Sequence, residues 1–191
     1  MVQRNYGDLG AVLNELKIEE VDGVLFDVGV SSMQIDMPDR GFSFQADGPL
    51  DMRMDTSQPV TAASLLASLD AESLAHLLSE YGDVRPSRRI ARAIIKRSES
   101  GALQTTRDLV EAVMEALPFV HGVPEEVRRV FQAVRIAVNE EFQALERGIT
   151  AAMESVNVGG RVVCISFHSG EDRIVKRLFQ EASRTRRVLH A

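Results

Sequence analysis

Apolar residues follow two different patterns along this chain. Two short runs, VDGVLFDV at 21–28 and RVVCISF at 161–167, lack the alternation that would leave one face of a strand polar. Such runs are typical of strands that are covered on both faces in a parallel sheet. We therefore expect two buried strands, which lie far apart in the sequence.

Elsewhere, apolar positions recur at the spacing of amphipathic helices. One face keeps this period from Glu125 to Val156. An unbroken helix of that length would measure about 45 Å, which is long for a helix that covers a sheet, so we expect a kink or stop near Gly148. The other predicted helices lie at 8–16, 61–69, 71–81, 86–99, 105–117 and 170–182.

The order of these elements is helix, strand, a helical stretch, helix, strand and helix. This order predicts an α/β fold whose parallel sheet is interrupted by an all-helical insertion. We assign residues 59–124 to the insertion and residues 1–58 and 125–191 to the α/β domain.

A long polar segment, GVSSMQIDMPDRGFSFQADGPLDMRMD at 29–55, follows the first strand without any helical period. Structureless segments longer than about 12 to 15 residues are uncommon in compact domains and are usually functional. In open parallel sheets, ligands bind outside the carboxyl ends of the strands. Asp27, Ser31 and Ser32 are therefore candidate contacts. A strand-end aspartate can accept hydrogen bonds from a hydroxyl or an amine, and capping a turn is the alternative role for Asp27.

The second predicted strand ends in SFHSGED, where His168 has two interpretations: a substrate contact, or a hydrogen-bonded part of the scaffold. We expect no metal site, because metal ligands cluster at recognisable spacings and the histidines of this chain are scattered. We expect no serine nucleophile either, since the motif G-x-S-x-G is absent. The histidines are His76, His121, His168 and His190.

Six cationic residues and no acid lie between residues 85 and 97, at steps that place them along one helix. Contact with nucleic-acid phosphates is one interpretation, for which we single out Arg88 and Arg92, and a solvated helix face is the other. The net charge of -6 argues against nonspecific coating of nucleic acid but is compatible with a local basic patch. The six residues are Arg85, Arg88, Arg89, Arg92, Lys96 and Arg97.

Cysteine usage and hydropathy restrict the compartment. Cys164 is the only cysteine, which excludes a disulfide framework, and no apolar run is long enough to span a bilayer. We therefore expect a reducing, aqueous compartment such as the cytoplasm, and no membrane partner.

Four segments resemble, in order, the signature motifs of the ribosomal RNA small subunit methyltransferase H family, also called MraW, and of its mitochondrial relatives. They are VDGVLFDVGVSSMQIDMPDRGFSFQADGPLDMRMD, YGDVRPSRRIARAI, FQAVRIAVNEEFQALE and GGRVVCISFHSGEDRIVKRLF. The similarity covers nearly the whole chain, and four long motifs in the same order are far more specific than any short pattern.

The resemblance implies an enzyme that uses S-adenosylmethionine to methylate the exocyclic amino group of a cytidine in small-subunit ribosomal RNA. It implies a Rossmann-like methyltransferase domain that carries a helical insertion, with cofactor contacts at Asp27, Gln34 and the aromatic Tyr6. Asp27 or a backbone carbonyl of residues 28–30 is then a candidate for the catalytic acceptor that holds the amino protons of the base. Expected partners are small-subunit ribosomal RNA or the assembling small subunit.

Compared with the family pattern, we expect a chain that is truncated at both ends, because a glycine-rich loop before the first strand and the C-terminal strands are absent. Gly170 also replaces the leucine of the motif FHSLEDR. Two strands are fewer than the roughly 5 to 6 of an ordinary sheet, so we expect a partial methyltransferase domain. The alternative function is a noncatalytic RNA-binding or ribosome-assembly module that lacks the methyl donor site. Three further alternatives stay open. The protein can form a homodimer, its natural start can lie upstream of Met1, and its compartment in a eukaryote would be the mitochondrial matrix.

Overall fold

The computed structural model of the protein describes residues 1–120 and 122–188. The chain folds into two compact units. Unit 1 comprises Met1–Gly29 and Glu140–Ala191, and unit 2 comprises Val30–Asn139. Each unit is described by itself below.

The chain passes from one unit to the other after Gly29 and after Asn139, whereas we expected the boundaries at residues 58 and 125. The segment that follows the first strand and the helix α7 (Glu125–Asn139) both belong to unit 2. The assignment of residues 59–124 to an insertion within a methyltransferase domain stays a prediction.

Unit 1 is built on a two-stranded parallel sheet of β1 (Val21–Asp27) and β2 (Val156–Ile165). The register pairs Asp27 with Ile165, so both strands end at the same edge of the sheet. Both predicted strands are confirmed, although β2 begins earlier than the predicted residue 161.

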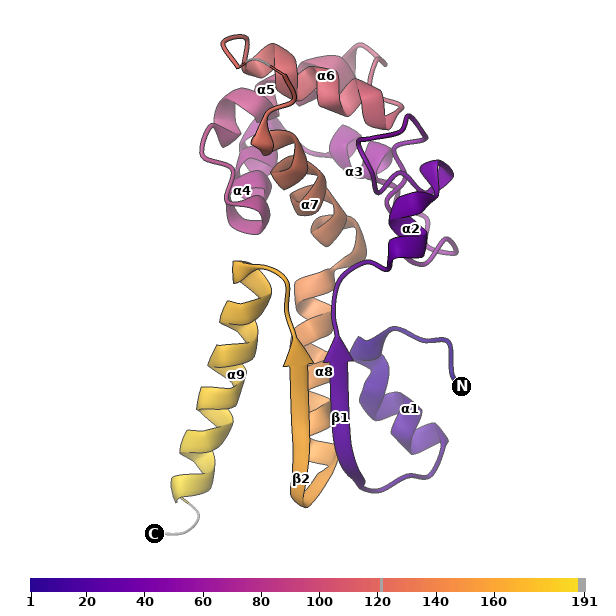
Figure 1. The fold of residues 1–191 in the computed structure, drawn as a ribbon, viewed down its shortest axis with the longest axis vertical. Coiled ribbons are helices and arrows are strands. Elements are labelled where there is room, and N and C mark those ends of the chain that lie inside the picture. The colour runs from indigo at the N-terminus through magenta and orange to yellow at the C-terminus, as the bar shows by residue number, and fades with distance from the viewer. Residues whose placement is uncertain (121, 189–191) are drawn as a thin grey trace. The chain divides into compact units, whose positions relative to one another are not determined.

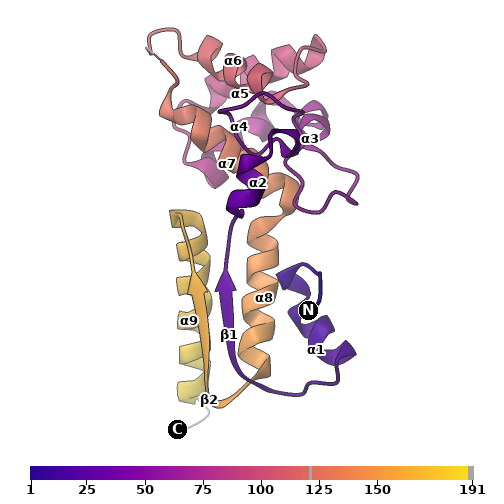
Figure 2. The same ribbon diagram turned by 45° about the vertical axis from the view of Figure 1, so that its right-hand side comes forward.

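Helix α8 (Glu141–Ser155) lies against one face of this sheet, between α1 (Leu9–Glu15) and α9 (Ser169–Val188) (Figure 1, Figure 2). The short 3-10 helix η1 (Tyr6–Asp8) also packs on α8. A strand, a crossover helix and a parallel strand form the repeating unit of α/β folds. The buried core of unit 1 consists of Phe26, Val28, Leu145, Ile149 and Ala152.

The other face of the sheet is open within the described part of unit 1, so the prediction of strands covered on both faces was wrong. Leu25, Val163 and Ile165 are 66%, 49% and 45% exposed, whereas Phe26 and Cys164 point toward the helices. The burial alternates although the polarity does not. A continuous apolar run therefore reports the chemistry of its side chains and not the number of covered faces.

The long helical period that ends at Val156 is divided between α7 and α8, and the break lies at Glu140 rather than near Gly148. Glu140 has φ 48° and ψ 40°, in the left-handed region, and this conformation ends the regular helix. Gly148 lies inside α8, where an added Cβ would be 2.9 Å from the carbonyl oxygen of Tyr6 and 3.1 Å from the ring of Phe26. Glycine at this position thus permits close packing of α8 rather than a kink.

Unit 2 is helical, and the predicted helices between the two strands are confirmed. Side chains of Thr61, Asp70 and Thr105 accept hydrogen bonds from backbone amides in the first turns of α3, α4 and α6. The elements are α2 (Ser32–Asp36), η2 (Pro38–Arg40), α3 (Ala62–Ser68), α4 (Ala71–Gly82), α5 (Ser87–Glu99), α6 (Thr106–Ala116) and α7. The largest fully buried side chains on these helices are Leu66, Leu74, Leu78, Ile90, Ile94, Leu109 and Ile136.

The segment after β1 is less irregular than predicted, since it contains α2 and η2. Its later part is also fixed by burial and hydrogen bonds. Leu50 and Met52 are 1% and 0% exposed. The buried side chain of Asn139 accepts a hydrogen bond from the amide of Met54 at 2.7 Å and donates one to the carbonyl of Met52 at 2.8 Å. Packing and main-chain contacts therefore order this segment, and its polar composition is misleading.

Candidate functional site

The carboxyl ends of β1 and β2 form the candidate site of unit 1. Asp27 is the last residue of β1 and is exposed. Gly29 has φ 102°, which glycine adopts without strain. An added Cβ on Gly29 would meet only the Cδ2 atom of Phe167, at 4.0 Å. The structure therefore places a carboxylate, an accessible backbone and an aromatic ring at one edge of the sheet.

Tyr6 belongs to the same unit as Asp27, but its contacts are those of a packing residue. Its hydroxyl donates a hydrogen bond to the carbonyl of Glu141 at 3.3 Å. Its ring makes an edge-to-face contact with Phe26, with the ring centroids 5.9 Å apart. These contacts hold η1 on α8, and a cofactor contact by Tyr6 stays a prediction.

His168 follows β2 and is half-buried against its own helix start. Its Nδ1 accepts a hydrogen bond from the amide of Gly170 at 3.1 Å, so in the neutral ring the proton lies on Nε2. Nε2 is 3.3 Å from Oε1 of Glu171 but is not aligned for a hydrogen bond. Glu171, 3% exposed, also accepts a hydrogen bond from the amide of Phe167 at 2.8 Å. These contacts favour the scaffold interpretation of His168.

Ser31 and Gln34 bond to each other at the start of α2. Gln34 Oε1 accepts a hydrogen bond from the amide of Ser31 at 3.0 Å, and Ser31 Oγ accepts one from the amide of Gln34 at 3.4 Å, which together form a capping box. Within residues 1–120 and 122–188, the Nε2 amide of Gln34 makes no hydrogen bond. Ser32 is exposed in the same turn. Cofactor contact by Gln34 and RNA contact by Ser31 and Ser32 stay predictions.

A groove of about 590 Å³ lies between α4 and α5 in unit 2. Arg88 and Arg92, the two arginines singled out in the sequence, line it from α5. Helix α4 contributes His76 and Ser79, together with the carboxylate of Glu72. The structure thus brings both predicted RNA-contact arginines into one concave surface.

One of the six cations has a partner within the protein. Arg97 forms ion pairs with Glu111 at 2.9 Å and with Glu115 at 2.6 Å, both on α6. Hydrogen bonding to Glu115, and then to Glu111, raises the pKa of Arg97 above its ordinary value. Arg97 therefore joins α5 to α6.

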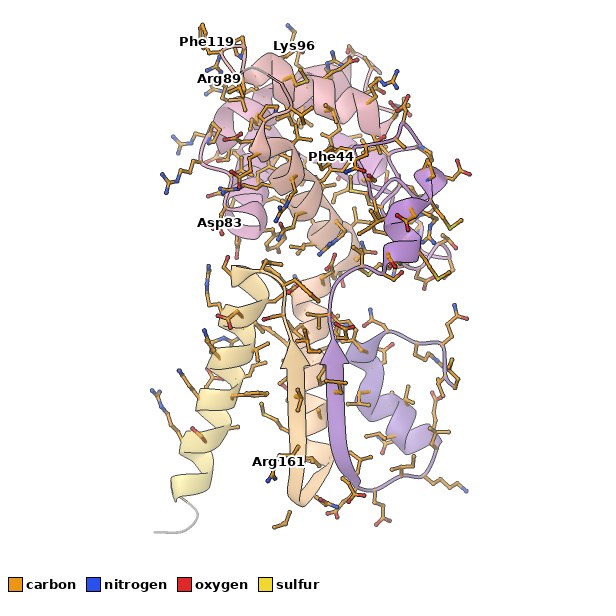
Figure 3. All side chains as sticks on the ribbon, viewed as in Figure 1. Phe44, Asp83, Arg89, Lys96, Phe119 and Arg161 are labelled. Carbon is orange, nitrogen blue, oxygen red and sulfur yellow. The ribbon has the colours of Figure 1, made fainter. Side chains whose placement is uncertain are left out.

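The other cations of this stretch point to solvent. Arg85, Arg88, Arg89, Arg92 and Lys96 are exposed, and none of them forms an ion pair with a residue that the structure describes. Figure 3 shows the labelled Arg89 and Lys96 extending outward from α5. Because none of these side chains is held in an ion pair with a described carboxylate, they are available to an anionic partner.

The sequence reasoning overlooked two residues at the end of β2. The exposed ring of Phe167 continues the alternating exposure of Val163 and Ile165 past the end of β2, which the polarity of the sequence does not show. Glu171 lies in the first turn of α9, a position typical of acidic residues. Its burial depends on contacts with the turn that follows β2, which no sequence pattern specifies.

Residues 1–120 and 122–188 contain no group of three or more His, Cys, Asp or Glu side chains placed to hold a metal ion. No helix within that part of the chain is long and apolar enough to cross a membrane.

The fold and the position of the candidate site define a class of protein. Unit 1 contains a parallel β1–α8–β2 unit with polar residues at the carboxyl ends of its strands. A helical unit lies between β1 and α8 in the sequence. This arrangement is a partial Rossmann-like methyltransferase fold. The chain belongs to the MraW methylase family, whose model matches residues 1–190. The resemblance and the fold class predicted from the sequence are confirmed.

Several relatives carry the name ribosomal RNA small subunit methyltransferase H. The protein of that name from Syntrophotalea carbinolica is 50% identical over 184 residues, which cover 95% of this chain and 58% of the relative. The one from Geobacter sulfurreducens is 49% identical over 94% of this chain and 58% of its own length. The one from Mycolicibacterium paratuberculosis is 45% identical over 97% of this chain and 50% of its own length. The chain thus spans little more than half the length of these relatives.

Proposed function

We propose that the protein acts in the methylation of small-subunit ribosomal RNA, with S-adenosylmethionine as methyl donor and the exocyclic amino group of a cytidine as acceptor. The observation that carries this proposal is the match to the MraW methylase family over residues 1–190. In this chain, Asp27 of the segment DVGVSSMQ lies at the exposed end of strand β1. The names of the relatives, ribosomal RNA small subunit methyltransferase H, support ribosomal RNA as the substrate class.

The polar groups present suit the proposed cofactor. S-adenosylmethionine supplies a methyl group on an electrophilic sulfonium, together with ribose hydroxyls and amino groups that need hydrogen-bond partners. The chain offers the carboxylate of Asp27 as an acceptor and, as a donor, the Nε2 amide of Gln34, which makes no hydrogen bond to a described residue. The backbone at Gly29 is open to close approach, because an added Cβ there would meet a single neighbour at 4.0 Å.

Asp27 has a further role in the proposed chemistry. The lone pair of a cytosine amino group is delocalised into the ring, which makes the nitrogen a poor nucleophile. A carboxylate that accepts a hydrogen bond from this amino group orients it and stabilises the positive charge that develops on nitrogen as the methyl group arrives. The amino nitrogen then releases one proton, and the Asp27 carboxylate is the acceptor we propose for it.

We also propose that the groove between α4 and α5 binds RNA phosphates through Arg88 and Arg92. Both arginines are exposed, line the groove and lack an ion pair among the described residues. Arginine binds phosphate oxygens with two parallel N–H donors, which suits this task. The cytoplasm, where assembling ribosomes and reduced thiols occur, is the compartment we propose.

Isothermal titration of the chain with S-adenosylmethionine tests the cofactor assignment. We expect saturable heat that is weakened by Gln34→Ala. The absence of heat at high protein concentration would overturn the enzyme proposal for this chain and leave the noncatalytic RNA-binding module in its place.

Methyl transfer to small-subunit ribosomal RNA, followed by nucleoside mass spectrometry, tests the catalytic assignment. Asp27→Asn keeps the size of the side chain and removes its charge, and we expect activity to fall by about 10² to 10⁴-fold. Asp39→Asn, at an exposed acid in η2, is the matched control and should retain full activity. Equal activities of the two variants would refute the role of Asp27.

A further inference from the structure

The turn after β2 displays an aromatic side chain at the edge of the sheet where Asp27 lies. Phe167 is 74% exposed. A single exposed apolar side chain is ordinary on protein surfaces and means little by itself. Its immediate surroundings make this one informative.

The backbone of Phe167 is held rigidly although its ring is exposed. Its amide donates a hydrogen bond of 2.8 Å to the buried carboxylate of Glu171. The next residue, His168, is bonded to Gly170 and packs on the ring of Phe142, with centroids 5.6 Å apart. The turn is therefore already ordered in the folded protein. Binding of a ligand to the ring would not have to order this backbone, so that part of the entropy loss on binding is avoided.

The ring lies over the backbone that follows Asp27. Cδ2 of Phe167 is the atom that an added Cβ on Gly29 would meet, at 4.0 Å. In the register of the sheet, Asp27 pairs with Ile165, two residues before Phe167. An acceptor of hydrogen bonds and an aromatic face thus occupy neighbouring positions on unit 1.

The other aromatic residues of unit 1 that the structure describes are engaged in packing. They are buried or half-buried, and three of them belong to the helix-covered core or pack beside it, while Phe142 packs on the ring of His168. They are Tyr6, Phe26, Phe142 and Phe179.

We propose that the ring of Phe167 is a stacking platform for a nucleobase at the carboxyl ends of β1 and β2, beside Asp27. The inference rests on the proposed function, because it assumes a nucleotide ligand. Every base has a π-face, and stacking on an aromatic side chain contributes about 1–3 kcal/mol per base in single-strand binding proteins. An enzyme that modifies a base must take it out of its stack, and an aromatic face replaces the stacking that is lost.

Two ligands carry a suitable ring: the target base of the RNA and the adenine of the methyl donor. The chain contains no tryptophan, so a tryptophan introduced at the platform reports on each of the two ligands when they are titrated separately. Phe167→Trp creates a single fluorophore at the proposed platform. Phe119→Trp does the same at an 87% exposed position of unit 2, labelled in Figure 3, and is the matched control.

Each variant is titrated with a short cytidine-containing RNA and, separately, with S-adenosylhomocysteine. We expect saturable quenching of Phe167→Trp by one of these ligands and only linear, collisional quenching of Phe119→Trp. Saturation with the RNA assigns the platform to the target base, and saturation with S-adenosylhomocysteine assigns it to the cofactor. If Phe167→Trp shows no saturable quenching while a labelled RNA still binds by anisotropy, the platform is refuted and the proposed function stands. If neither ligand binds the parent chain, the proposed function fails together with the platform.

A second pair of variants separates stacking from ordinary apolar packing. Phe167→Ala should weaken binding of the assigned ligand by about tenfold, and Phe167→Tyr should restore it, because both effects follow the aromatic face. Phe167→Leu keeps an apolar side chain without that face and should behave like the alanine variant. Parent-like binding by Phe167→Leu would overturn the proposal. Blue-shifted emission of Phe167→Trp that depends on protein concentration would also overturn it, since the ring would then pack against a second copy of the chain.

Discussion

Reversing the charges of Arg88 and Arg92 is expected to weaken the binding of single-stranded ribosomal RNA and to flatten its dependence on salt. Both side chains line the groove between α4 and α5, are exposed, and have no ion pair among the described residues that would compete for them. The perturbation is the double variant Arg88→Glu with Arg92→Glu.

The expected magnitude follows from counterion release. Each phosphate contact on a single strand contributes about 0.7 to the slope of log K against log salt, so the loss of two contacts lowers the slope by about 1.4. Relative to 1 M salt, where this contribution vanishes, affinity should fall by roughly 25-fold at 0.1 M and by roughly 4-fold at 0.4 M. Repulsion between the new carboxylates and the phosphates makes these values lower bounds.

Fluorescence anisotropy of a labelled RNA across a salt series measures both quantities. Arg107→Glu with Arg128→Glu is the matched control, because it makes the same change in net charge on unit 2 at two exposed arginines outside the lining of the groove. We expect the control to shift affinity much less at each salt concentration. Equal slopes for the parent and the groove variant, or equal losses in the groove variant and its control, would refute binding of phosphates in the groove.

Three further predictions concern stability and reactivity. Asn139→Ala should lower the free energy of unfolding by about 2–4 kcal/mol in urea denaturation, because it removes the hydrogen bonds that pin the segment after β1 and leaves buried main-chain groups unpaired; an unchanged midpoint would contradict this. The hydrogen bond from Arg53 holds the pKa of Asp51 below its ordinary value of 3.8, so this carboxylate stabilises the fold above that pH and the stabilisation is lost as pH falls below it. Urea titrations at pH 5 and pH 3 should therefore show a larger loss in the parent than in Asp51→Asn, and parallel losses would exclude the effect. Burial, and then the negative charge of Glu171, raises the pKa of the Cys164 thiol, so iodoacetamide should alkylate the folded chain at least about tenfold more slowly than the urea-unfolded chain at pH 8, and equal rates by mass spectrometry would refute it.

The helices of unit 2 could be predicted from the sequence because their signals are local. Thr61, Asp70 and Thr105 each cap the first turn of a helix that follows them, and a cap is defined by residues within one turn of each other. The break at Glu140 could not be predicted in the same way. It depends on a left-handed backbone at a residue that carries no such preference, while the glycine that attracted attention, Gly148, serves close packing.

The candidate site was only partly readable from the sequence. Asp27 could be chosen because strand ends in parallel sheets attract ligands, and the structure leaves it exposed. The capping-box pattern of Ser31 and Gln34 was present in the sequence but was considered only as a cofactor motif. The fixing of Phe167 by Glu171 could not be foreseen, because it requires a carboxylate to be buried against the turn that follows β2.

The position of unit 2 between β1 and α8 has a consequence for the order of folding. Closing a flexible loop of roughly 110 residues, the length of unit 2, costs about 4 kcal/mol of chain entropy. Many contacts of unit 2 connect helices that are neighbours in the sequence, such as α4 with α5 and α5 with α6, and such contacts form rapidly, whereas the packing of α7 on α4 joins segments further apart. We therefore expect unit 2 to fold first and the sheet last. On the ribosome, β1 emerges well before β2, and until β2 arrives the edge of β1 that pairs with β2 has no partner, so this interval exposes an apolar strand to aggregation.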